Sequence, residues 1–386
     1  MLELHDPEQA FEQLEEWLRE QGFFAPGGES LVADLYLGYG LSSRIRRTRG
    51  APPPEPCRLP LAACAVRPVG HADVNYDNDL TELRIGSWRR TWSDAEYRAA
   101  VGAVRRAISR GDVYQVNLVQ HLEAPFAGTA SALAARLAPL TQPNTGFPDG
   151  TAWRHLEGAG WSIVTASPEL FLARRGRRLW TRPIKGTRPR GRRAELLASE
   201  KDAAEHVMIV DLERNDLSRV CRHGTVRWPE LRAPASLAGV EHLVSTVEGE
   251  LRPDVGLAEI LAATFPGGSV TGAPKIAAVD LIAGLEPVGR GASMGALGRV
   301  YGNGNLELAL TIRTFAIADG MVHLWVGGGV VWDSDAQGEV DESFAKAHPL
   351  LEAIGAPLER PGSAATPNAP AAERRDREAS APRGAR

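Results

Sequence analysis

The chain of 386 residues has only three cysteines, no long apolar run and no large excess of charge of either sign. Cys57, Cys64 and Cys221 form no CxxC or Cys/His spacing, which excludes the usual cysteine-based metal sites and indicates reduced thiols. A net charge of −4 gives no reason to expect nucleic acid or a membrane surface as a partner. Because no run of about 18 apolar residues occurs and residues 1–20 lack the basic start of a signal peptide, we expect a cytoplasmic protein.

Helical signals occur at both ends of the chain and in its centre. Near the N-terminus, apolar residues recur at helical spacing between Phe11 and Leu18. Ser93 and Glu96 form an S-x-x-E capping box, an apolar stripe follows, and Gly111 ends the predicted helix. Further helices are expected over residues 192–217, 255–263, 274–284 and 335–354.

Strand signals lie between these helices. Residues 113–120 alternate with a period of two, which places Gln115 and Asn117 on one face. Residues 306–317 also alternate and are predicted as one strand, which a turn at 318–320 joins to the next strand in a hairpin. Other strand-like runs cover residues 161–165, 170–174, 180–185 and 297–301. This order, without regular βαβ alternation, predicts an α+β fold: a large two-sheet β-sandwich with helices packed outside.

Nine short segments carry the chemistry that the sequence suggests. They are residues 114–118, 167–169, 183–187, 205–220, 241–245, 265–275, 310–314, 327–329 and 339–346. Each is weak evidence alone, but in this order the chain resembles the chorismate-utilising enzymes over about residues 93–354. The resemblance implies a chorismate-binding catalytic region at 93–354 and a variable N-terminal part of the same sandwich at 1–92. Residues 355–386 contain almost no large apolar side chain and are predicted to be a disordered tail.

The resemblance implies three catalytic residues: Lys185, Glu169 and His242. A neutral Lys185 amine can add to the ring of chorismate with allylic loss of the 4-hydroxyl, and ammonia can later displace it. Desolvation or a nearby cation would help the lysine lose its proton, and Glu169 would protonate the departing hydroxyl. Without the resemblance, each residue has a commoner reading: a solvated amine, a turn carboxylate and a structural histidine.

Chorismate carries two carboxylates, so its site needs cationic groups and backbone donors. The resemblance implies Glu205 and Glu342 as ligands of Mg²⁺, with Glu339 one helical turn before Glu342. Without the resemblance, Glu342 and Lys346 are an ordinary i,i+4 ion pair on the surface of a helix.

Several residues are predicted to bind the substrate itself. The Arg313 guanidinium can hold a carboxylate bidentately. The glycine-rich segment 267–272 leads into Pro274, so its backbone N–H groups and a helix N-terminus could face an anion, although the phosphate-loop order GxxxxGK[ST] is absent. The predicted substrate-binding residues are Gly186, Thr187, Ser269, Arg313, Gly327, Gly328, Gly329 and Lys346.

Two positions separate the branches of the family. Lys185 resembles the lysine of aminodeoxychorismate synthases, where anthranilate synthases carry a small residue. Gln115 stands where isochorismate and salicylate synthases use a lysine to activate water, which favours ammonia as the nucleophile. The resemblance thus implies an enzyme that makes 4-amino-4-deoxychorismate for folate biosynthesis, with an anthranilate synthase component I as the alternative. A non-catalytic binder would require loss of the acid, lysine or metal residues, and none is missing.

The nitrogen source is expected to be a second polypeptide. No Gly-x-Cys-x-Gly nucleophile context surrounds any cysteine, so we expect a glutamine amidotransferase subunit to supply ammonia. Two departures from the family leave pocket details and any tryptophan site open: Arg299 stands where a tyrosine is usual, and residues 142–148 replace an aromatic Pro-Tyr segment.

Overall fold

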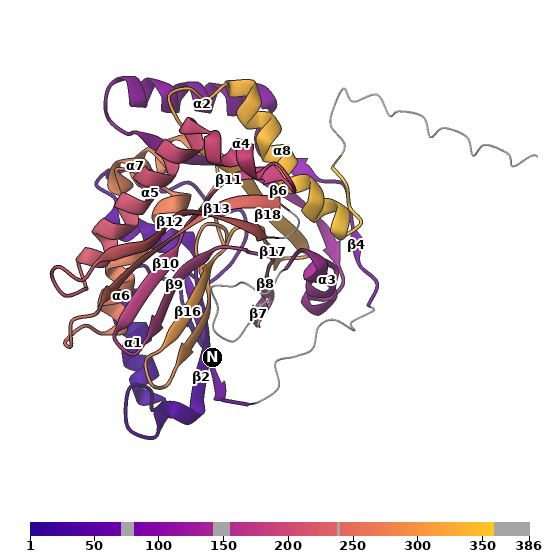
Figure 1. The fold of residues 1–386 in the computed structure, drawn as a ribbon. Coiled ribbons are helices and arrows are strands. Elements are labelled where there is room, and N and C mark those ends of the chain that lie inside the picture. The colour runs from indigo at the N-terminus through magenta and orange to yellow at the C-terminus, as the bar shows by residue number, and fades with distance from the viewer. Residues whose placement is uncertain (71–80, 142–154, 238–239, 359–386) are drawn as a thin grey trace, which may run out of the picture.

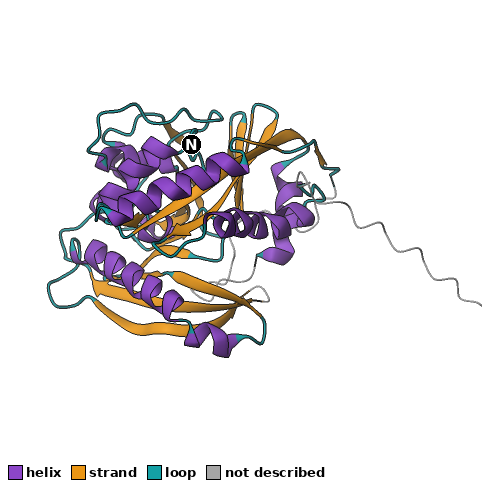
Figure 2. Ribbon diagram, turned by 90° about the horizontal axis from the view of Figure 1, so that it is seen from above, coloured by secondary structure: helices purple, strands orange, loops and turns teal. Residues whose placement is uncertain are grey.

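The computed structural model describes residues 1–70, 81–141, 155–237 and 240–358. They form two antiparallel sheets with helices on the outside (Figures 1 and 2), which confirms the predicted α+β class. The segment 142–148 and the tail from residue 359 lie outside the described residues. No helix in the described ranges is long and apolar enough to cross a membrane.

The larger sheet has ten strands. In order across it lie β1 (Leu2–Leu4), β3 (Ala62–Pro68), β2 (Leu31–Leu37), β15 (Ala296–Tyr301), β16 (Leu306–Leu310), β9 (Leu170–Arg175), β10 (Arg178–Arg182), β13 (Val240–Glu250) and β11 (Ile184–Pro189), and β12 (Arg227–Leu237) also pairs with β13. The prediction of a single strand at 180–185 is wrong. Pro183 has no N–H to donate to a ladder, and it separates β10 from β11, which pair with successive parts of β13.

The smaller sheet has eight strands. In order they are β14 (Gly272–Ala273), β6 (Gln115–Ala127), β18 (Met321–Val330), β17 (Thr314–Ala318), β8 (Trp161–Thr165) and β7 (His155–Gly158), while β4 (Arg84–Ile85) and β5 (Arg89–Arg90) also pair with β6. The predicted hairpin is confirmed, because β17 and β18 pair with Ala318 opposite Met321. Asp319 and Gly320 have φ of 53° and 73°, as the type I′ turns of two-residue hairpins require.

The prediction of one strand over residues 306–317 is wrong. β16 belongs to the ten-stranded sheet and β17 to the eight-stranded sheet, so the chain crosses between the sheets at residues 311–313. Arg313 has φ of 49°, a left-handed conformation that redirects the chain there. Both strands are buried, and a period of two is the same in either sheet, so the pattern could not reveal the crossing.

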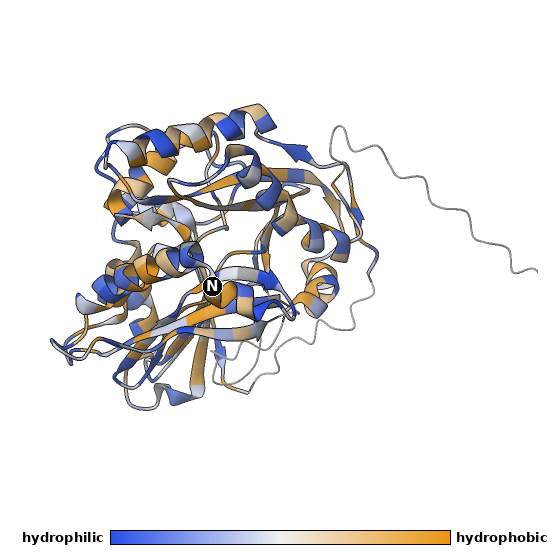
Figure 3. Cartoon of the chain, turned by 45° about the horizontal axis from the view of Figure 1, so that its top comes forward, coloured by the Kyte–Doolittle hydropathy of each residue, from blue (hydrophilic) through white to orange (hydrophobic). Residues whose placement is uncertain are grey.

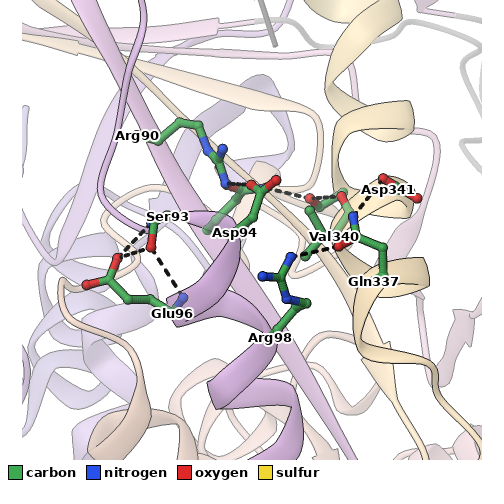
Figure 4. A network of polar contacts seen from close by, with 10 residues as sticks. Arg90, Ser93, Asp94, Glu96, Arg98, Gln337, Val340 and Asp341 are labelled. Atoms are coloured by element: carbon green, nitrogen blue, oxygen red, sulfur yellow. Dashed lines mark hydrogen bonds and ion pairs between the residues drawn. The ribbon is translucent and has the colours of Figure 1, made fainter. Parts of the chain in front are cut away.

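The helices are α1 (Ala10–Glu20), α2 (Asp94–Ser109), α3 (Ala130–Leu137), α4 (Arg193–Ala198), α5 (Glu200–Ser218), α6 (Leu257–Thr264), α7 (Lys275–Leu285) and α8 (Ala336–Ala353). The single helix predicted over 192–217 is two helices, because Ser199 begins a new one as N-cap of α5. The capping box is confirmed: the Ser93 hydroxyl accepts from the Glu96 N–H, and the Glu96 carboxylate accepts from the Ser93 N–H (Figure 4).

The core fills two spaces. One apolar cluster lies between the two sheets, with Leu35 and Leu308 from the larger and Leu118 and Ile163 from the smaller sheet. A second cluster lies between the smaller sheet and helices α3 and α8. Polar and apolar residues are interspersed along the outer helices, as Figure 3 shows. The apolar stripes of α1 and α2 are buried, whereas Leu197 of α4 and Val207 of α5 are half exposed.

Helix α8 is held in place by α2 and by the smaller sheet. The Arg98 guanidinium of α2 donates to the Gln337 amide oxygen of α8 at 2.7 Å, and Arg90 pairs with Asp94 at the start of α2 (Figure 4). Arg90 also lies over the ring of Phe344, 4.6 Å from its centroid. These contacts fix the helix that carries Glu339, Glu342 and Lys346.

Candidate active site

Lys185 lies at a β-bulge in β11. The pairing register with β13 shifts between Lys185 and Thr187, and Gly186 at the shift has φ of 64°. A Cβ at Gly186 would lie 2.6 Å from Leu196 Cδ1, so neither the backbone angle nor the space accommodates another residue. Bulges redirect neighbouring side chains, and the Lys185 amine donates to the carbonyl oxygen of Ser269 at 3.2 Å.

Ser269 joins Lys185 to Glu169. Its carbonyl oxygen accepts from the lysine, and its hydroxyl donates to Glu169 Oε1 at 2.8 Å. The same carboxylate oxygen accepts from the backbone N–H of Ile184 at 3.4 Å, and Glu169 is only 6% exposed. The structure therefore brings together the predicted nucleophile, the predicted acid and a residue predicted to bind substrate.

Burial favours the neutral forms of both ionisable groups. Burial lowers the pKa of Lys185, while the charges of Glu169 and Glu205 act in the opposite direction. Burial raises the pKa of Glu169, against the effects of Lys185 and of the hydrogen bond from Ser269. Transfer of one proton from the ammonium to the carboxylate gives a neutral amine beside a neutral acid, which is what the predicted chemistry requires.

The loop that carries Ser269 is anchored on α5. The Gly268 N–H donates to Glu213 Oε1 at 3.0 Å, and Lys275 forms a buried ion pair with Asp216. Burial, with a contribution from Asp216, raises the pKa of Glu213 to about 7. Glu213 was not among the predicted site residues, because nothing in its local sequence pattern shows that it supports this loop.

Three backbone N–H groups of the 267–272 segment are bonded within the protein. The N–H of Gly268 is bonded to Glu213, that of Val270 to the carbonyl of Gly267 at 3.4 Å, and that of Thr271 to the carbonyl of Gly268 at 3.3 Å. These three donors are used inside the protein. They hold the loop that positions Ser269, and anion binding by the remaining backbone donors of the segment stays a prediction.

His242 lies on β13 directly opposite Thr187. Its Nδ1 contacts the carbonyl oxygen of Gly186 at 3.0 Å, and because a carbonyl can only accept, this nitrogen carries the hydrogen. Burial lowers the pKa of His242, so the ring is neutral at neutral pH and Nε2 carries its lone pair. The side chain of Thr187 lies outside the described part of the chain.

A cluster of charged residues from α8 converges on Gly328 of β18. A Cβ at Gly328 would lie 3.1 Å from Glu342 Oε1, 3.2 Å from Lys346 Nζ and 3.3 Å from Glu339 Oε2. Lys346 pairs with Glu342 at 2.7 Å and donates to the carbonyl of Gly327 at 2.8 Å. Gly328 therefore leaves open the position that these three side chains surround.

The two flanking glycines are required by the neighbouring strand. A Cβ at Gly327 would lie 1.9 Å from the Leu118 carbonyl oxygen, and one at Gly329 would lie 1.9 Å from Gln115 Nε2. The amide oxygen of buried Gln115 has no hydrogen-bond partner among the described residues. A buried oxygen that accepts no hydrogen bond from the protein suits a ligand that donates an N–H or O–H group.

The carboxylates of α5 and α8 fit a magnesium ion. Glu205 and Glu342 both lie close enough to Lys185 for their charges to act on its pKa. Carboxylate oxygens are ligands that Mg²⁺ prefers, and Mg²⁺ usually takes one or two protein carboxylates and completes its shell with water and substrate.

Two further cationic or basic side chains face the Lys185 and Glu169 pair. Arg313 makes no hydrogen bond or ion pair through its guanidinium within the described residues, and burial lowers its pKa against the effect of Glu169. His206, next to Glu205, is fully buried without a hydrogen-bond partner in the described part of the chain. Burial and the charge of Lys185 lower the pKa of His206 to about 4. Arg313 was among the predicted site residues, whereas His206 carries no signal in the sequence that separates it from a structural histidine.

A model of the family described as chorismate binding enzyme matches residues 62–352. Anthranilate synthase component 1 of Thermus thermophilus is 41% identical over 283 residues, which cover 70% of this chain and 60% of that protein. Aminodeoxychorismate synthase component 1 of Escherichia coli is 38% identical over 304 residues, which cover 74% of this chain and 66% of that protein. The chain spans about three fifths of the length of such curated relatives.

Solved structures show the same fold. Anthranilate synthase component I of Streptococcus pneumoniae superposes with a TM-score of 0.74 at 24% identity, covering 87% of this chain and 84% of that one. The isochorismate synthase MenF of Escherichia coli gives a TM-score of 0.66 at 18% identity, covering 90% and 83%. Relatives with two different reactions are about equally similar in sequence, so the comparisons establish the family and leave the reaction open. The chain belongs to the family of chorismate-binding enzymes.

Proposed function

We propose that this chain is the chorismate-binding component of an aminodeoxychorismate synthase, which replaces the 4-hydroxyl of chorismate with an amino group. The observation that carries the proposal is the partly buried Lys185 amine, which lies next to the Gly186 bulge and is joined through Ser269 to the buried acid Glu169. A lysine in this position supplies a nucleophile. An enzyme that adds ammonia directly to chorismate has no need of one.

The first half of the reaction forms a covalent intermediate. The neutral Lys185 amine forms a bond to a ring carbon of chorismate, the ring double bonds shift, and the bond to the 4-hydroxyl breaks. Glu169 gives its proton to the departing oxygen, so water leaves. The proton that the lysine nitrogen loses restores the acid.

The second half of the reaction releases Lys185 from the intermediate as a free amine. Ammonia forms a bond to the carbon that carried the hydroxyl, the double bonds shift back, and the bond to Lys185 breaks, while the proton that the new amine loses passes to the departing lysine nitrogen. The product is 4-amino-4-deoxychorismate, a precursor for para-aminobenzoate and folate. The free amide oxygen of Gln115 is suited to accept a hydrogen bond from incoming ammonia.

Charged residues hold the substrate in this scheme. Arg313 takes one carboxylate, because its partly buried guanidinium makes no ion pair within the described residues. Glu205, Glu339 and Glu342 would hold Mg²⁺, which when bound supplies positive charge for the other carboxylate. Lys346 and Gly328 lie beside these ligands and shape the space for that carboxylate.

Anthranilate synthase component I is the second candidate, since a relative of that name is 41% identical over 283 residues. Both reactions consume chorismate and ammonia, but the products differ. Incubation of the purified chain with chorismate, Mg²⁺ and ammonium, followed by chromatography and mass analysis, should show aminodeoxychorismate. Anthranilate as the product would contradict the proposal.

The same assay tests the nitrogen source. Relatives named component 1 imply a partner component, and we infer a glutamine amidotransferase that delivers neutral ammonia. We expect turnover with ammonium to rise with pH as free ammonia increases. Glutamine should be inert until a glutaminase subunit is added, and glutamine-dependent turnover by the rigorously purified chain alone would rule out this role for a partner.

Substitutions on helix α8 test the proposal that the carboxylates hold Mg²⁺. Glu342→Gln should raise the Mg²⁺ concentration needed for half-maximal turnover by at least about 10-fold, because even partners one shell further out cost 10–100-fold. A chelator should abolish activity of the wild type, and Mg²⁺ should restore it. Glu352→Gln is the matched control, since Glu352 lies on the same helix and contacts His348. Unchanged Mg²⁺ dependence in Glu342→Gln would place the metal elsewhere.

A further inference from the structure

Two histidines and a glutamate form a second cluster of polar groups, on the eight-stranded sheet. His121 and Glu123 lie on β6, and His323 lies directly opposite Glu123 on β18. Residues two apart on a strand, and residues opposite each other on neighbouring strands, share a face of the sheet. His121 Nε2 lies 3.0 Å from His323 Nδ1, and His323 Nδ1 lies 3.6 Å from Glu123 Oε2.

The neighbouring strand β5 orients two of these side chains. The Thr91 hydroxyl, directly after β5, contacts His121 Nδ1 at 2.7 Å, and Arg89 donates through Nε to Glu123 Oε1 at 2.9 Å. His121 Nε2 and Glu123 Oε2 are thereby left facing His323. Metal-binding histidines and carboxylates in proteins are usually oriented by such outer hydrogen bonds.

The two rings are hydrogen-bonded to each other through His121 Nε2 and His323 Nδ1, and a bound metal ion would replace this hydrogen bond. His121 and His323 are 3% and 1% exposed, and His323 Nε2 has no hydrogen-bond partner within the described residues. Burial, with the charges of His323 and Arg89, lowers the pKa of His121 to about 3, and burial also lowers the pKa of His323. Both rings are therefore neutral at neutral pH, the form in which imidazole binds a metal.

We propose that His121 Nε2, His323 Nδ1 and the Glu123 carboxylate bind a divalent transition-metal ion of the Zn²⁺ class. Two imidazoles and one carboxylate are a common zinc ligand set, whereas Mg²⁺ prefers oxygen ligands. Ligand atoms about 2.0–2.2 Å from one ion lie roughly 3–4 Å apart. The observed separations of 3.0 and 3.6 Å match, and all three ligand atoms lie within 4.8 Å of one another.

The zinc cluster is separate from the chorismate site. His323 precedes Gly327 on β18 by four residues, roughly 13 Å along a strand. The two sites share no residue. A bound ion would cross-link β6 and β18, the two strands that carry Gln115 and the Gly327–Gly329 segment.

The proposal is tested by Zn²⁺ titration of the metal-stripped protein in the presence of excess Mg²⁺. We expect one Zn²⁺ per chain with micromolar or tighter affinity. His121→Gln and His323→Gln should each weaken binding by at least about 10-fold. His155→Gln is the matched control, because His155 is a buried histidine of the same sheet outside the cluster. Glu342→Gln should also leave Zn²⁺ binding unchanged.

A spectroscopic measurement on the wild type does not depend on how the variants fold. Electron paramagnetic resonance of stoichiometric Cu²⁺ should show two coordinated imidazole nitrogens. The fluorescence of Trp325 should be quenched, since its ring centroid lies 4.8 Å from that of His121. No Zn²⁺ binding at micromolar concentration, unchanged affinity in both histidine variants, or Cu²⁺ without two nitrogen ligands would overturn the proposal.

Discussion

In Lys185→Ala the rate of product formation should fall by at least about 1,000-fold, because the variant lacks the nucleophile. The variant should still bind chorismate, because it keeps the groups that hold the substrate. Lys185→Arg should be as inactive as the alanine variant. Arginine keeps a positive charge at this position, but it is not deprotonated in proteins and cannot attack. The pair of variants separates a nucleophilic role from a role as a charge beside Glu169.

Intact-mass analysis gives the direct evidence for the intermediate. Wild-type protein incubated with chorismate and Mg²⁺ without ammonia should gain the mass of chorismate less one water. The sequence has only four lysines, at positions 185, 201, 275 and 346, so peptide mapping can assign the adduct without ambiguity. Lys201→Ala serves as the lysine control. An adduct on another residue, or normal turnover by Lys185→Ala, would contradict the mechanism.

Local signals in the sequence predicted local structure well. The Ser93 capping box and the 318–320 turn each depend on residues that are close in sequence, and both are present. Strands β12 and β13 were not predicted. In β13 every residue from Glu241 to Gly249 is buried, so neither face is polar and the alternation of a half-exposed strand is absent. Polar residues such as Glu248, which pairs with Arg178, further mask the strand.

The sequence predicted which residues form the site, but it did not predict the contacts that position them. Motif resemblance identified Lys185, Glu169 and Ser269, and the structure places them in one hydrogen-bonded group. The motifs could not show the bulge at Gly186, because a shift of register depends on the partner strand. Nor could they show that Glu213 supports Gly268, since the two lie 55 residues apart. Contacts of this kind follow from how the sheets and α5 are packed.

Glu169→Gln should lower turnover by roughly 100- to 10,000-fold, the usual contribution of general acid–base catalysis. The amide retains a carbonyl oxygen that can accept from Ser269 and Ile184, so the variant should fold and bind chorismate as the wild type does. Because departure of the hydroxyl is part of adduct formation, the Lys185 adduct should also form more slowly by a similar factor. Glu157→Gln, at an exposed carboxylate of β7, is the matched control.

The pH dependence separates the acid from the nucleophile. Turnover requires neutral Lys185, so it should rise with pH through the pKa of the lysine, which burial places below the ordinary value. It also requires protonated Glu169, so it should fall as pH passes the pKa of the glutamate, which burial places above the ordinary value. The profile of kcat/KM, measured at a constant concentration of free ammonia, is then bell-shaped. In Glu169→Gln the descending limb should vanish while the ascending limb remains, because the amide does not titrate. A descending limb that persists in this variant, or wild-type rates of adduct formation, would assign the acid to another group.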